Sequence, residues 1–168
     1  MSREREFFTV RGYALQNQDD NTLTPSMEDY MEMAYRLGKD KNFIRMGDLA
    51  EALNVQPPSA SKMVQKLSDM GYLNYKRYGV IEFTEDGRKV GKFLLERHET
   101  IEHFLKILGV TQNTLSDTEK IEHNISEETY KQIKLFVYFM EQYPQWLERY
   151  RAFLNHKNIY QKDIKESK

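Results

Sequence analysis

The sequence has 168 residues, of which 39% are hydrophobic and 12% aromatic, enough for one packed domain or two small ones. The formal net charge is −1, which excludes a globally basic nucleic-acid-binding protein, so any DNA contact must be local. Cysteine is absent, which excludes disulfides, thiolate zinc sites and cysteine nucleophiles. There is neither an apolar run of about 18 residues nor a signal-peptide pattern, so we expect a soluble, cytoplasmic protein without membrane contact.

Residues 1–22 show no sustained apolar periodicity and end in a polar run, which predicts a flexible N-terminal arm. An arm that contacts DNA or a partner is the alternative. The next segment has a helical apolar stripe, with Ser26 expected as the N-cap and Gly38 as the end of the helix.

Residues 46–71 carry the clearest pattern in the chain. A short helix over about 46–53 is followed by a tight turn at 54–56 and by a second helix that begins with Pro57 and Pro58. Two short helices joined in this way are typical of a helix-turn-helix. Residues 72–76 and 79–83 are rich in Tyr, Val, Ile and Phe and predict a hairpin. The combination predicts a winged helix-turn-helix domain over residues 23–93.

The second half of the chain reads as helical. Thr84 is expected to cap a long helix over about 85–108, and apolar stripes predict further helices over about 111–124, 127–142 and 145–155. We therefore expect a helical domain over residues 94–156 and a polar, frayed tail over 157–168. The predicted fold class is mainly α, with an N-terminal winged helix-turn-helix followed by an α-helical domain.

The helix-turn-helix and its hairpin carry residue types that contact bases and phosphates. Small and hydrogen-bonding side chains occupy the start of the second helix, and residues 45–78 have an excess of two positive charges. The predicted DNA-contacting residues are Arg45, Gln56, Pro58, Ser59, Ala60, Ser61, Lys62, Gln65, Lys66, Lys76, Arg77 and Tyr78. A winged helix used for protein contacts is the alternative. A module of this kind binds DNA well as a dimer.

Carboxylates and imidazoles recur at helical spacing in four places. These are Asp29/Glu32, His98/Glu102, Glu99/His103 and Glu119/Glu122/His123. Each has an ordinary explanation when taken alone: Asp29 fits the third position of a capping box with Ser26, and His98 with Glu102 fits a surface ion pair. Taken together, oxygen and nitrogen ligands without sulfur favour Mn²⁺, and Fe²⁺, Co²⁺ or Zn²⁺ would also bind by raw affinity. "HETIEH" lacks the second histidine of the zincin motif.

Five segments carry a family resemblance: "TPSMEDYMEMAY", "LAEALNVQPPSASKMVQKL", "GYLNYKRYGVIEFTEDGRKVGK", "RHETIEHFLKILGV" and "EKIEHNIS". Over residues 24–126 they resemble the manganese-dependent branch of the diphtheria-toxin-repressor family. The resemblance implies a homodimer of winged helices that binds double-stranded operator DNA when metal is bound, and it makes residues 94–156 the dimerisation and metal-binding domain. The implied metal ligands are Asp29, Glu32, His98, Glu119, Glu122 and His123.

The resemblance also implies the cofactor and the output. Mn²⁺ is expected, as one or two ions per subunit, with Fe²⁺, Co²⁺, Zn²⁺ or Cd²⁺ as substitutes. The iron branch carries a Met and a Cys where this chain has Asp29 and Glu119. The expected function is metal-dependent transcriptional regulation that represses metal-uptake genes.

Two other classes of function stay open on the residues alone. One is a winged-helix repressor that responds to Fe²⁺, to Zn²⁺ or to a non-metal ligand. The other is a metallohydrolase, but the sequence contains no nucleophile constellation or substrate loop, so we expect neither an enzyme nor an organic small-molecule substrate.

Overall fold

The computed structural model describes residues 23–41 and 43–166, and the predicted N-terminal arm lies outside these ranges. The chain divides into two compact units that meet between Leu95 and Glu96. Within the described ranges, no helix combines the length and the apolar character that crossing a membrane requires.

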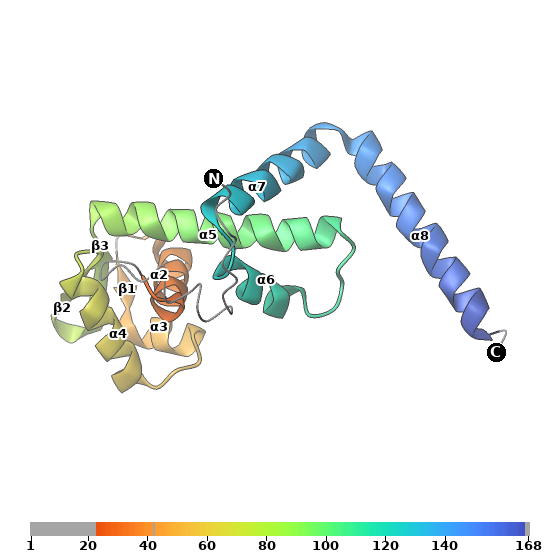
Figure 1. The fold of residues 1–168 in the computed structure, drawn as a ribbon. Helices are drawn as coiled ribbons and strands as arrows, with labels where there is room; N and C mark the ends of the chain where they lie inside the picture. The colour runs from red at the N-terminus through yellow and green to blue at the C-terminus, as the bar shows by residue number, and fades with distance from the viewer. Residues whose placement is uncertain (1–22, 42, 167–168) are drawn as a thin grey trace, which may run out of the picture. The chain divides into compact units, whose positions relative to one another are not determined.

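The first unit is a winged helix-turn-helix (Figure 1). Its elements in chain order are α2 (Pro25–Gly38), β1 (Ile44–Arg45), α3 (Met46–Ala52), α4 (Pro57–Asp69), β2 (Leu73–Lys76), the 3₁₀ turn η1 (Arg77–Gly79), β3 (Val80–Phe83) and the first half of α5 (Glu85–Ile107). The sheet order is β1-β3-β2, and all pairs are antiparallel. The predicted helix-turn-helix and hairpin are confirmed, whereas β1 was not predicted.

The start of α2 differs from the sequence prediction. Thr24 is the N-cap, its side chain accepts a hydrogen bond from the Met27 backbone N–H at 3.4 Å, and Pro25 takes the first helical position. Ser26 therefore lies inside the helix, and the prediction that it is the N-cap is wrong. The capping-box explanation of Asp29 falls with it, because Asp29 no longer occupies the third position after the cap.

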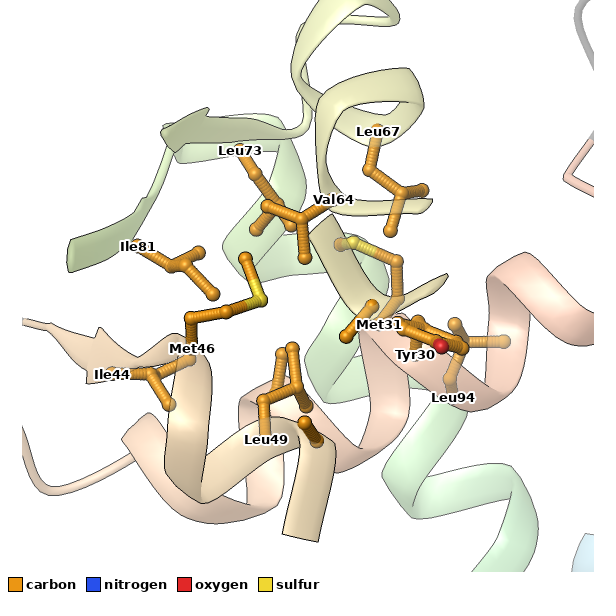
Figure 2. Packing of buried hydrophobic residues seen from close by; sticks show 13 residues of the cluster. Tyr30, Met31, Ile44, Met46, Leu49, Val64, Leu67, Leu73, Ile81 and Leu94 are labelled. Atoms are coloured by element: carbon orange, nitrogen blue, oxygen red, sulfur yellow. The ribbon is translucent and has the colours of Figure 1, made fainter. Parts of the chain in front are cut away.

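One apolar core holds the first unit together (Figure 2). Each of its helices and strands contributes buried side chains to it, including Met31, Ile44, Leu49, Val64, Leu67, Leu73, Ile81 and Leu94. Helix α5 approaches α2 closely at Gly91, where an added Cβ would lie 2.8 Å from Cβ of Tyr35. The core fixes α4 against the sheet, so the outward face of α4 is presented by a rigid frame.

The N-terminus of α5 is anchored to the end of the turn before β2. The Thr84 hydroxyl donates to the Gly71 carbonyl at 2.7 Å and accepts from the Gly87 N–H at 3.0 Å, which confirms Thr84 as the cap. Gly87 packs so closely on this segment that an added Cβ would lie 1.8 Å from the Tyr72 carbonyl oxygen. Glycine is therefore required there by the space available.

The second unit contains the rest of α5, α6 (Thr114–Glu122), α7 (Glu127–Gln142) and α8 (Pro144–Glu166). Ile101 and Leu105 of α5 are buried, as are Tyr130 and Val137 of α7. The ring of Phe104 meets that of Phe136 edge-on, with centroids 5.7 Å apart. The mainly helical fold class is confirmed.

Helix α8 runs to Glu166, so the prediction that the last helix ends near residue 155 is wrong. The sequence has no glycine or proline after Pro144 to end the helix, and its last residues are mostly good helix formers. The chain bends at Pro144, between α7 and α8 (Figure 1). Large apolar side chains remain exposed along these two helices, namely Leu135, Tyr138, Phe139, Trp146 and Phe153.

Candidate metal centre and nucleic-acid interface

Four of the predicted metal ligands come together within the second unit. His98 lies on α5, Glu119 and Glu122 lie on α6, and His123 is the C-cap of α6. Nδ1 of His98 lies 3.3 Å from Oε2 of Glu122 and 3.8 Å from Oε1 of Glu119. Nε2 of His123 lies 3.7 Å from Oε1 of Glu122 and 4.0 Å from Oε2 of Glu119. The two carboxylates thus lie between two imidazoles.

Helical spacing explains how α6 presents three of these groups. Residues at i, i+3 and i+4 share one face of a helix, so Glu119, Glu122 and His123 converge. One ligand atom from each lies within 4.8 Å of the others. The neighbouring Lys120 pairs instead with Asp117 at 3.3 Å.

Burial separates the members of this cluster. His98 and Glu122 are 5% and 2% exposed, whereas the side chain of Glu119 is 46% exposed. Oε2 of Glu122 is buried and makes no hydrogen bond to any described residue, although the His98 ring lies beside it. A buried oxygen without a hydrogen bond costs about 1–3 kcal/mol, and a coordinated cation would remove that cost. The donors therefore fit a divalent metal ion of hard or borderline character.

Asp29 and Glu32 lie on α2, in the first unit. Oε1 of Glu32 accepts a hydrogen bond from the Arg36 guanidinium at 2.8 Å, one helical turn further along. The role of Asp29 and Glu32 as metal ligands stays a prediction. The i,i+4 spacing of Glu32 and Arg36 was visible in the sequence and could have indicated the pair.

In the clusters His98/Glu102 and Glu99/His103, Glu102 and His103 pair with residues outside the proposed metal site. Glu102 pairs with Lys106 at 2.8 Å, and Nδ1 of His103 lies 3.3 Å from Oε1 of Glu141 on α7. Glu99 and His103 line an open surface pocket of about 380 Å³ between α5 and α7. The structure therefore brings His98, but not Glu102 or His103, to the cluster on α6.

Helix α4 exposes most of the side chains predicted to contact DNA. Gln56, Pro58, Ser59, Lys62, Gln65 and Lys66 are exposed, and Ser61 is half-buried. Ala60 is the exception, because its side chain is 0% exposed. The prediction that α4 exposes Ala60 is wrong, since the helical period places residue 60 with Val64 and Leu67 in the core.

The wing consists of β2, the tight turn η1 and β3, and it carries several of the polar residues predicted to contact DNA. Lys76 on β2 pairs with Glu82 on β3 at 2.6 Å. Tyr78 at the tip is 96% exposed, and its backbone is left-handed, with φ 66° and ψ 24°. Arg45 is exposed on β1, opposite Val80. Strand β1, like the contact between Glu82 and Lys76, depends on sheet register that local sequence patterns did not indicate.

The chain matches two family models that together span most of its length. Residues 22–81 match "Iron dependent repressor, N-terminal DNA binding domain", and residues 84–150 match "Iron dependent repressor, metal binding and dimerisation domain". The HTH-type transcriptional regulator MntR of Lysinibacillus sphaericus (strain C3-41) is 42% identical over 137 residues, covering 81% of this chain and 99% of that protein. MntR of Shouchella clausii (strain KSM-K16) is 48% identical over 120 residues, covering 70% and 84%.

Solved structures show the same fold. The metal-dependent transcriptional regulator MtsR superposes with a TM-score of 0.62 at 26% identity, over 70% of this chain and 55% of that chain. The manganese regulator SloR superposes with a TM-score of 0.58 at 28% identity, over the same shares. This chain thus spans about half the length of those two proteins.

Fold, ligand cluster and similarities together define a metal-responsive, DNA-binding transcriptional regulator. The chain belongs to the iron-dependent repressor family, which confirms the resemblance seen in the sequence.

Proposed function

We propose that the protein is a Mn²⁺-responsive repressor that binds double-stranded operator DNA as a homodimer in the cytoplasm and lowers transcription of metal-uptake genes when metal is bound. The observation that carries this proposal is the buried Glu122 carboxylate, beside His98 and with one oxygen lacking a hydrogen bond among the described residues. The two relatives named MntR and the manganese regulator SloR support manganese as the metal. No enzymatic activity is part of this proposal.

Six side chains form the proposed ligand set. His98, Glu119, Glu122 and His123 supply the cluster of the second unit, and Asp29 and Glu32 of α2 complete it by their match in residue type to the manganese-dependent branch of the family. Oxygen and imidazole donors without sulfur suit Mn²⁺, and Fe²⁺, Co²⁺, Zn²⁺ or Cd²⁺ would substitute. Four carboxylates carry enough negative charge to balance two divalent ions per subunit.

Metal sensing follows from the charge of these ligands. Without a cation, four carboxylates that approach one another repel, and the arrangement that brings them together is disfavoured. A bound metal supplies the positive charge that makes this arrangement stable. Because Asp29 and Glu32 belong to the DNA-reading unit, the ligand set couples that unit to the dimerisation domain. The coupling free energy equals the difference in metal-binding free energy between the DNA-competent state and the other states.

The proposed DNA contacts are made by α4 and the wing. Gln56, Pro58, Ser59, Ser61, Lys62, Gln65 and Lys66 would face the major groove or its phosphates, with Arg45, Lys76, Arg77 and Tyr78 on the flanking backbone. Ala60 is no longer included, because it is buried. A homodimer would place two copies of α4 about one helical turn of DNA apart.

The test is DNA binding by the full chain as a function of metal. A binding sequence is first selected from a random DNA library in Mn²⁺, and its dissociation constant is then measured with Mn²⁺, Fe²⁺, Zn²⁺ or a chelator. We expect Mn²⁺ to tighten binding at least about tenfold over the chelated protein, within the usual range of allosteric coupling. Equal affinity with and without chelator would contradict the proposal, and a response to Fe²⁺ or Zn²⁺ alone would reassign the metal.

Variants make the test specific for the site. Glu122→Gln removes the buried carboxylate and should abolish the metal response. Glu102→Gln is the matched control, since it removes a carboxylate that pairs with Lys106 in the same unit, and it should leave the response unchanged.

A further inference from the structure

The face of α4 that points away from the core carries one internal hydrogen bond. Pro58, Lys62, Gln65 and Asp69 follow the helical period opposite Ala60, Val64 and Leu67, which are buried. Within this outward face, Nε2 of Gln65 donates to Oδ1 of Asp69 at 2.8 Å. Among the residues that the structure describes, Gln65 thus has its hydrogen bond with a carboxylate on its own helix.

The chemistry of this pair fixes the orientation of the amide. An ionised carboxylate only accepts hydrogen bonds, so the NH₂ group of Gln65 must face Asp69. The carbonyl oxygen, Oε1, is then the free end of the side chain. Gln65 consequently presents an acceptor to anything that approaches α4 from outside.

The position of Asp69 is not explained by helix stability. It is the last residue of α4, where a negative charge interacts unfavourably with the helix dipole. A bare carboxylate on a DNA-facing surface would also repel phosphates. A role in holding Gln65 accounts for a residue that is otherwise unfavourable at this place.

We propose that Asp69 is a positioning residue that holds Gln65 with its carbonyl oxygen outward, so that the protein selects a base with an exocyclic amino group, adenine N6 or cytosine N4, in the major groove. The inference rests on the proposed DNA contacts of α4. In the major groove adenine and cytosine present hydrogen-bond donors, whereas guanine and thymine present only acceptors and the thymine methyl group. An amide held in this orientation pairs with the first two bases and meets an acceptor on the others.

The experiment is selection of binding sites from a random DNA library by the full-length chain in Mn²⁺. Wild type should enrich adenine or cytosine over guanine and thymine at one position per half-site, by at least about fivefold. Gln65→Met keeps the length of the side chain and should remove this preference. Asp69→Ala frees the amide to turn, so that it also donates to guanine or thymine, and the preference should broaden to all four bases.

Controls separate positioning from general damage. Glu85→Ala breaks another exposed i,i+4 pair of the first unit, in which Lys89 lies 2.8 Å from Glu85 on α5, and it should leave base preference unchanged. Thermal unfolding should be nearly equal for all variants, because a structural role would change stability and not the base preference.

The results also distinguish this inference from the proposed function. If wild type in Mn²⁺ enriches no sequence, the proposed DNA-binding function is wrong and this inference falls with it. If wild type enriches a site but Asp69→Ala has the wild-type preference at every position, DNA binding stands and the positioning role of Asp69 is refuted.

Discussion

Nδ1 of His98 lies 3.3 Å from Oε2 of Glu122, and this contact joins α5 to α6 inside the second unit. Both side chains are buried, and the carboxylate oxygen has no hydrogen bond from a described residue. The protein thus keeps a carboxylate in its interior at a site where burying a neutral side chain would cost less free energy. We interpret this as the structural signature of a metal ligand.

Replacing this carboxylate should separate metal binding from folding. Glu122→Gln keeps the shape of the side chain and removes its charge. We expect Mn²⁺ affinity to fall at least about tenfold, since losing only a hydrogen-bond partner of a ligand commonly has an effect of that size, while the metal-free protein unfolds at the same or a higher temperature. Isothermal titration with Mn²⁺ and thermal unfolding in chelator measure the two effects. Unchanged Mn²⁺ affinity would remove Glu122 from the ligand set.

Metal removal should lower stability by an amount set by the ratio of the free Mn²⁺ concentration to its dissociation constant. At a free Mn²⁺ concentration of about 100 times the dissociation constant, binding to the native state alone adds about 2.7 kcal/mol to the free energy of unfolding. Urea denaturation with Mn²⁺ and with chelator measures this difference. Glu122→Gln should lose it and Glu102→Gln should keep it, so a gain that survives in both variants would place the ion elsewhere.

Arg36 should act on the metal site through Glu32. Its guanidinium donates a hydrogen bond to Oε1 of Glu32 at 2.8 Å and so restrains the rotamer of this carboxylate. Arg36→Met should therefore weaken Mn²⁺ binding about tenfold, as expected when an outer-shell partner is lost. Lys39→Met removes an exposed positive charge near the end of the same helix and should have no effect. Tighter binding in Arg36→Met would instead identify Arg36 as a competitor of the metal.

Two glycines in helices should respond in opposite ways to the same substitution. Gly87→Ala forces a methyl group against the Tyr72 carbonyl, and we expect a loss of at least about 2 kcal/mol in the free energy of unfolding, in the range of overpacking. Gly47→Ala, on α3, meets no atom within 4 Å and should be neutral or stabilising by up to about 1 kcal/mol. Denaturant unfolding of both variants tests the close approach of α5 to the segment before β2.

Lys76 should contribute to DNA affinity without contributing to sequence preference. If it contacts a phosphate, Lys76→Ala weakens binding similarly for all sequences and lowers the slope of log affinity against log salt by about 1. Lys131→Ala, which removes a lysine paired with Glu127 in the second unit, is the control and should keep the wild-type slope. A wild-type slope in Lys76→Ala would mean that its ion pair with Glu82 persists on DNA.

Local sequence signals predicted most of the helices, because single residues determine where these helices begin or end. Pro57 starts α4, Thr84 caps α5 and Pro144 separates α7 from α8. Strand β1 was missed because two residues carry no period, and the strand exists only through its pairing with β3. The cap of α2 was misplaced because Thr24 and Ser26 are equivalent by type, and the preference of Pro25 for the first helical position decides between them.

The candidate site, too, could be predicted where local sequence patterns determine it and could not where tertiary contacts do. The spacing of Glu119, Glu122 and His123 predicted one shared helix face from the sequence alone. Their meeting with His98 is a tertiary contact between residues 24 positions apart in the case of His98 and Glu122, which no local pattern contains. The burial of Ala60 was missed although the sequence contained a signal for it, since the helical period places residue 60 on the same face as the buried Val64 and Leu67.

Tyr78 places a bulky residue in a left-handed turn that glycine would occupy without strain. A non-glycine residue in that conformation costs about 1–2 kcal/mol, and an almost fully exposed ring recovers little of it by packing. A directed-evolution campaign that selects for heat tolerance alone should therefore replace Tyr78 by glycine early. If the wing tip touches DNA as proposed, the more heat-stable glycine variants would bind DNA more weakly.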